Sequence, residues 1–166
     1  MNSGWGDLRF EEAFDNYIVN NGSFSVRNID LLTQNNIVLH ISGSNPLTAT
    51  NYIRYHHDDA RINNNSVLNA VRIEVVGTDV DNDNEFINYS GGTLNLSDNI
   101  DASRGRFLIE NYGIINQSGR FMDVDPNELQ CYNYAGATWN FGGGTSSDGD
   151  VELYCNYSGS TFNYTR

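Results

Sequence analysis

The residues best suited to chemistry form a short acidic run with a carboxylate at every second position. Asp79, Asp81, Asp83 and Glu85 lie within one polar stretch of the chain. Calcium loops present several hard oxygen ligands of this kind to a single ion. The run lacks the glycine and the final glutamate of an EF-hand loop at their required positions. The sequence therefore predicts either a calcium site of another geometry or an acidic loop in solvent.

Two adjacent histidines form a second candidate. His56 and His57 precede Asp58 and Asp59, and His40 is the only other histidine. Neighbouring residues on a strand point to opposite faces, so the pair cannot bind one metal ion without a loop. We interpret these histidines as structural or loop residues.

The sequence does not assemble a catalytic site. Carboxylate pairs such as Asp58 with Asp59, or Asp148 with Asp150, could supply a general acid and a general base. No Ser-His-Asp set, Cys-His pair or phosphate-binding loop is recognisable. The prediction is a protein without enzymatic activity, and its one candidate cofactor is calcium.

Composition narrows the classes of partner. The chain has 166 residues, a formal net charge of -12 and a pI near 4.3. This length suits one domain with its own core. Nucleic acids and anionic membranes attract clustered basic residues, so neither is expected as a partner. No apolar run is long enough to span a bilayer, and the first residues lack the pattern of a signal peptide.

The elements that position these residues come from an internal repeat. Asn-Tyr pairs begin at residues 88, 111, 133 and 156, which gives steps of 23, 22 and 23 residues. Each pair follows a short apolar run and precedes an alternating strand phrase, of which the first is TLNL. One period therefore holds two strands, a tight turn and a longer polar return, which is one coil of a β-solenoid.

Stacking such coils at about 4.8 Å would place each repeated residue against its own copies. We expect the asparagines to form hydrogen-bonded ladders along the axis. The residues concerned are Asn88, Asn111, Asn133 and Asn156, and a second set of Asn95, Asn116, Asn140 and Asn163. Exposed tyrosines and threonines of the same coils would offer a contact surface, namely Tyr89, Tyr112, Tyr134, Tyr157, Thr93, Thr138 and Thr161.

The repeat divides the single domain into three parts. Residues 85–166 form regular coils, residues 17–84 form degenerate coils, and residues 1–16 form an N-terminal cap. Phe10, Ala13 and Phe14 recur at helical spacing, so the cap is expected to contain a short amphipathic helix.

The two cysteines lie in neighbouring coils. Cys131 and Cys155 each follow a leucine by two residues in equivalent strands. Stacked coils would bring them within the range of a disulfide, although two small buried thiols would pack there equally well. Both alternatives remain open at this point.

The repeats resemble those of a known class of protein. The runs NNGSFSV, NYSGGTLNLS, NYGIINQSG and NYSGSTFNY look like coils from parallel β-helix segments of large secreted and surface proteins of bacteria, especially the adhesin-like proteins of the Bacteroidetes. The resemblance is clear over residues 85–166. It implies a right-handed parallel β-helix, extracellular display, and a role as a stalk, adhesive surface or filament component. It supplies no catalytic residues.

These observations predict an extracellular structural or adhesive solenoid. Its last strand phrase reaches Arg166 without a cap, and an open strand edge is a template for pairing, so end-to-end association of copies is expected. Surface glycans are the other expected partners. A carbohydrate-binding or polysaccharide-degrading β-helix is the alternative function, and an ice-binding solenoid with ranked threonines is a minor one.

Overall fold

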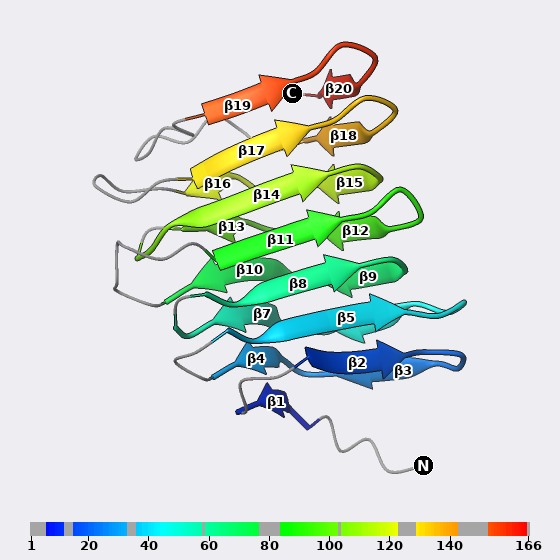
Figure 1. The fold of residues 1–166 in the computed structure, drawn as a ribbon, viewed down its shortest axis with the longest axis vertical. Coiled ribbons are helices and arrows are strands. Elements are labelled where there is room, and N and C mark those ends of the chain that lie inside the picture. The colour runs from blue at the N-terminus through cyan, green and yellow to red at the C-terminus, as the bar shows by residue number, and fades with distance from the viewer. Residues whose placement is uncertain are drawn as a thin grey trace.

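The computed structural model describes residues 6–11, 15–32, 36–57, 59–76, 84–102, 104–122, 129–142 and 153–165. Every regular element in these ranges is a β-strand, and neighbouring strands pair in parallel. The strands stack in three sheets around one axis, so the chain is a parallel β-solenoid (Figure 1). This confirms the predicted fold class. The described residues contain no helix of the length and apolarity needed to cross a membrane.

Each sheet is formed by one strand from each of several successive coils. Sheet A contains β1 (Leu8–Phe10), β4 (Ile29–Leu31), β7 (Tyr52–Tyr55), β10 (Arg72–Val75), β13 (Ile100–Asp101) and β16 (Phe121–Met122). Sheet B contains β2 (Asp15–Val19), β5 (Val38–Ser42), β8 (Arg61–Asn64), β11 (Asn84–Asn88), β14 (Phe107–Asn111), β17 (Leu129–Asn133) and β19 (Leu153–Asn156). Sheet C contains β3 (Phe24–Val26), β6 (Leu47–Ala49), β9 (Val67–Ala70), β12 (Thr93–Leu96), β15 (Ile114–Gln117), β18 (Thr138–Phe141) and β20 (Thr161–Tyr164).

The chain passes from sheet B to sheet C and then to sheet A before it climbs to the next coil. In Figure 1 the strands of sheet B run from left to right in front, and the chain returns behind them as it rises, which makes the coil right-handed. Asn88 pairs with Asn111, Asn111 with Asn133, and Asn133 with Asn156. The predicted spacing of 22 or 23 residues is therefore the spacing between paired strands in the later coils.

Sheet A is the main difference from the sequence prediction. The stretch expected to be a polar return between coils contains a third short strand, for example β13 and β16. Ile100 and Phe121 are the inward residues of these strands and are paired with each other across neighbouring coils. One apolar residue per coil is enough to close the third side of the core.

The N-terminal segment also differs from its prediction. Leu8–Phe10 is the edge strand β1 of sheet A, so the helical cap is wrong over this part of the chain. Leu8 pairs with Ile29, and Phe10 pairs with Leu31. The strand satisfies the open edge of β4 and packs Leu8 and Phe10 against the core, which a helix could not do with the same residues. Ala13 and Phe14 lie outside the described residues.

The core is a continuous column of side chains inside the coils. In sheet C one inward column passes through Leu47, Leu68, Leu94, Ile115 and Trp139, all of them fully buried. Each of these side chains packs on its counterparts in the coils above and below. Thr93 and Asn95 point outward and alternate with Leu94 and Leu96, which point into the core, as the sequence pattern predicts.

Candidate functional site

The first set of repeated asparagines forms a ladder at the turn between sheets B and C, and this ladder is buried from Asn64 to Asn133. The Nδ2 of each amide donates to the Oδ1 of the next coil, over 2.9, 2.9, 2.8 and 2.8 Å. The ladder runs through Asn64, Asn88, Asn111, Asn133 and Asn156. It therefore begins one coil earlier than the sequence analysis placed it.

Asn64, Asn88 and Asn111 also bond to the backbone of their own turns. The Oδ1 of Asn111 accepts a bond from the backbone N–H of Gly113 at 3.1 Å, and its Nδ2 donates to the carbonyl of Thr138 at 3.1 Å. Asn111 thus makes four hydrogen bonds, two to its ladder neighbours and two to the backbone. The side chain holds the turn in place and has no hydrogen-bonding capacity left for a ligand.

The second set of asparagines forms a ladder on the outer face of sheet C. Asn95, Asn116, Asn140 and Asn163 each donate from Nδ2 to the Oδ1 of the preceding coil, over 2.8, 2.7, 2.7 and 2.8 Å. The chain of bonds continues backward through Asn69 to the hydroxyl of Thr48. These amides are partly exposed, so each still has a donor and an acceptor site facing solvent.

The threonine column beside the outer ladder is interrupted. Thr93 is paired with Ile114, which is paired with Thr138, and Thr138 is paired with Thr161. The coil before Thr93 supplies Val67. Apolar residues therefore interrupt the column at Val67 and Ile114, and it is not the unbroken threonine rank that the ice-binding alternative requires.

The repeated tyrosines stack on one another at the turn. The ring centroids of Tyr89, Tyr112, Tyr134 and Tyr157 are separated in succession by 6.4, 4.3 and 4.8 Å. The hydroxyl of Tyr134 donates to Glu110 at 2.8 Å, and burial raises the pKa of this tyrosine above its usual value. The inner rings use their faces in the stack, so any contact with another molecule would involve ring edges and hydroxyls.

The predicted calcium ligands are only partly described. Asp79, Asp81 and Asp83 lie outside the described residues. Glu85 lies on β11, where its carboxylate forms an ion pair with Arg61. Across the described ranges no cluster of three or more His, Cys, Asp or Glu side chains is arranged to hold a metal ion. The calcium site stays a prediction.

Two of the three histidines contact side chains of neighbouring coils. His56 follows β7, and its Nε2 lies 3.0 Å from Oδ1 of Asp30 in the preceding coil. His40 stacks on Tyr17 with a centroid distance of 4.7 Å. His57 directly follows His56 in the sequence, and Asp58 lies outside the described part of the chain.

The cysteines lie on opposite faces of sheet B. Cys131 pairs with Tyr154, and Cys155 pairs with Tyr132, so the two cysteines are offset by one residue. Cys131 is fully buried, Cys155 is partly exposed, and no disulfide joins them. The assumed equivalence of the two strands was wrong by one position, and this moves one thiol to the outer face.

The thiols should therefore differ in reactivity. We expect a thiol reagent to modify two cysteines per chain in denaturant but only Cys155 in the folded protein, because Cys131 is buried in the core. Cys155→Ser is expected to abolish the native-state reaction. Protein purified without reductant that shows no thiol in denaturant would contradict the arrangement.

The outer face of sheet A carries a column of charges that the sequence analysis missed. Strand pairing aligns Arg9, Asp30, Arg54, Glu74 and Asp101 in successive coils. The first three pairs of neighbours in this column have opposite charges, and such cross-strand pairs stabilise the strands that carry them. Arg54 donates to Glu74 at 2.8 and 2.6 Å, and its guanidinium lies 3.8 Å from the centre of the Tyr52 ring.

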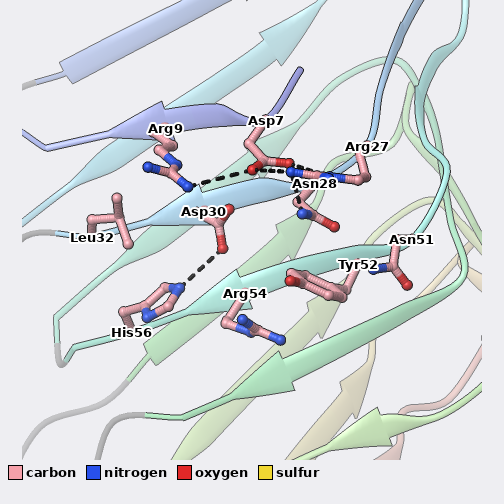
Figure 2. A pocket seen from close by; sticks show the side chains of 10 residues that line it. All are labelled: Asp7, Arg9, Arg27, Asn28, Asp30, Leu32, Asn51, Tyr52, Arg54 and His56. Carbon is pink, nitrogen blue, oxygen red and sulfur yellow. Dashed lines mark hydrogen bonds and ion pairs between the residues drawn. The ribbon is translucent and has the colours of Figure 1, made fainter. Parts of the chain in front are cut away.

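A second charged group flanks this column at the N-terminal end. Asp7 accepts two bonds from Arg27, at 2.8 and 2.7 Å, and one from Asn28 at 2.7 Å. Figure 2 shows Asp7 between Arg9 and Arg27, with Asn28 beside it. The hydrogen bonds from Arg27 hold the pKa of Asp7 below its usual value, against a smaller opposing effect of desolvation.

These residues border a hollow of about 540 Å³ on the outer face of sheet A (Figure 2). A second hollow of about 450 Å³ lies farther along the same face, and Arg54 borders both. Asp101 and Arg104 line the second hollow. The two hollows follow the axis of the solenoid and bring together side chains that lie about one coil apart in the sequence.

Comparison of the chain with protein-family models, with curated proteins and with solved structures finds no match.

Proposed function

We propose that the chain is a non-enzymatic structural and adhesive module, displayed outside the cell, whose stacked coils form a rigid rod. One observation carries the proposal: the most frequently repeated polar side chains bond to their own copies along the axis. A catalytic polar residue needs free capacity toward a substrate, whereas the buried ladder has none. The repeated asparagines thus stabilise the stack of coils.

The extracellular location follows from the resemblance of the repeats to surface solenoids of bacteria. Calcium bound near Asp79, Asp81, Asp83 and Glu85 is part of the same proposal, since it would neutralise acidic side chains in a chain of net charge -12.

We propose further that copies associate end to end. Phe24 and Phe162 occupy the two ends of the inward column of sheet C and are 39% and 36% exposed. Placing Phe162 of one copy against Phe24 of the next would continue this column. The outer ladder would continue in the same register, from Asn163 to Ser25.

The order of the sheets supports this contact. The first described strand, β1, belongs to sheet A, and the last, β20, belongs to sheet C. Within the chain a strand of sheet C is followed by one of sheet A in the next position around the coil. A second copy stacked beyond β20 would supply β1 at that position, and the winding would continue across the junction.

Sedimentation velocity over a range of concentrations tests the association. We expect the average mass to rise with concentration, and negative-stain images to show rods longer than one chain. Phe162→Asp should abolish the rise because it places a charge in the apolar contact. Ile114→Asp is the matched control, since Ile114 is exposed on the outer face in mid-stack. A single monomeric species at every concentration, with and without calcium, would contradict the proposal.

Carbohydrate binding is the second candidate function. The observation that favours it is the pair of hollows along the outer face of sheet A, which bring arginine, carboxylate, amide and tyrosine side chains together. Polysaccharide degradation would need a general acid and base free of structural partners. Asp30 is bonded to His56 and Glu74 to Arg54, so binding is favoured over hydrolysis at this face.

A further inference from the structure

The hollow on sheet A contains a buried acceptor that no described residue satisfies. Asn28 is 4% exposed and lies in the column between Asp7 and Tyr52. Its Nδ2 donates to Asp7, but its Oδ1 has no hydrogen-bond partner among the described residues. A buried acceptor without a donor costs free energy, so an N–H or O–H donor that reached Asn28 Oδ1 from this hollow would be stabilised.

A strong donor lies in the same hollow. The Arg9 side chain is 59% exposed, and within the described part of the chain its one ion pair, to Asp7, has an N–O distance of 3.5 Å. This distance is at the limit of a hydrogen bond, so most of the donor capacity of Arg9 faces the hollow. The face therefore offers an acceptor and a donor at the same time, which is what a hydroxyl group requires.

The remaining charges of the hollow are already neutralised within the protein. Arg27 binds both oxygens of Asp7, while Arg54 and Arg72 both bind Glu74. An anionic ligand would lie beside the carboxylates of Asp7 and Asp30 and would approach a chain of net charge -12. A cationic ligand would meet three arginines. The electrostatics thus favour an uncharged ligand that bonds through hydroxyl groups.

The length of the face indicates a ligand of several units. The two hollows have volumes of about 540 and 450 Å³, each within the range of small-molecule sites, and they share Arg54. Arg9 and Arg54 lie two coils apart, which is about 10 Å along the axis. An extended ligand would meet a polar side chain at each coil it passes.

We propose that the outer face of sheet A binds an uncharged oligosaccharide along the axis of the solenoid, with a hydroxyl that donates to Asn28 Oδ1 and another that accepts from Arg9. This inference rests on the second candidate function, carbohydrate binding, and is independent of end-to-end association. The internally paired arginines and carboxylates hold their side chains in fixed positions, so little order is lost on binding.

Isothermal titration calorimetry of the full chain with cellohexaose, mannohexaose, N-acetylchitohexaose and oligogalacturonate tests the proposal. We expect at least one of the three neutral hexasaccharides to bind and oligogalacturonate to bind more weakly. Arg9→Met should weaken binding by about tenfold or more, the loss expected for one hydrogen bond to a charged group. Asn28→Leu should weaken it similarly. Arg61→Met, which removes the same charge from sheet B, should leave binding unchanged.

The outcomes separate this proposal from the others. Absence of binding by all three neutral hexasaccharides, or binding of oligogalacturonate alone, overturns the ligand class. Binding that Arg9→Met leaves unchanged overturns the location, and Arg9 is exposed enough for this variant to fold. Sedimentation of wild-type protein without glycan reports on the rod independently, so failure of glycan binding leaves the structural function untouched.

Discussion

Replacing Asn111 by leucine is expected to lower the free energy of unfolding by about 3–5 kcal/mol. Leucine has nearly the same shape, so the change removes hydrogen bonds without leaving a large cavity. The Nδ2 of Asn111 donates to Asn133 and to the carbonyl of Thr138, and its Oδ1 accepts from Asn88 and Gly113. Among these partners, Asn133 Oδ1 and the Gly113 N–H lose fully buried bonds, and the Thr138 carbonyl loses a partly buried one.

The size of the effect comes from burial. Asn88, Asn111 and Asn133 are each 0% exposed. A buried polar group left without a partner costs about 1–3 kcal/mol, whereas an exposed one is satisfied by water. The loss of stability should extend to the neighbouring coils, because hydrogen bonds in a chain of amides polarise and reinforce one another.

Asn116→Ala is the matched control, because Asn116 belongs to the outer ladder and is partly exposed. We expect it to cost less than about 1 kcal/mol, since water replaces the lost bonds. Urea unfolding followed by circular dichroism and by the fluorescence of the buried Trp139 measures both variants. Equal losses for Asn111→Leu and Asn116→Ala would show that burial does not distinguish the two ladders.

Sheets B and C were predictable because their signals recur. The Asn-Tyr pair and the alternating phrase after it appear four times, and two-residue alternation identifies the inward side chains. The same counting would have placed the cysteines correctly. Cys131 precedes its ladder residue Asn133 by two positions, whereas Cys155 precedes Asn156 by one, and this difference moves the two thiols to opposite faces.

Sheet A was not predictable by the same reasoning because its strands are too short to show a period. The two-residue strands β13 and β16 each place one apolar residue inward, which cannot be told from a chance apolar residue in a loop. Phe10 showed a similar ambiguity, since it fits the start of the helical pattern Phe10, Ala13 and Phe14 as well as a strand that also contains Leu8. Pairing with β4 decides between the two.

The charged face of sheet A depends on register and was therefore hidden. Arg9, Asp30, Arg54 and Glu74 alternate in sign, but each lies in a different coil and in a different local sequence. Their alignment is visible only once every coil boundary is known. The unsatisfied Oδ1 of Asn28 has no sequence signal at all, since it depends on which donors the fold brings near it.

Turn glycines give the sharpest remaining test, because the sequence treats Gly22 and Gly43 alike and the structure does not. Gly43 has a φ of 118°, and a Cβ there would lie 2.2 Å from the carbonyl oxygen of Asn20. A Cβ at Gly22 would meet no atom within 4 Å. Gly43→Ala therefore combines backbone strain with a clash against backbone, and we expect it to cost about 3–4 kcal/mol locally.

Gly22→Ala is expected to change stability by less than about 1 kcal/mol, in the stabilising direction, because it reduces the entropy of the unfolded chain. Hydrogen exchange of the Asn20 and Asn45 amides measures both variants where the effect arises, since Asn20 donates to Ser42 and Asn45 donates to Asn20. Exchange should accelerate strongly in Gly43→Ala and stay unchanged or slow down in Gly22→Ala. Similar protection in both variants would mean that this turn rearranges to accept a side chain, and the first two coils would then be held by the core rather than by the turn.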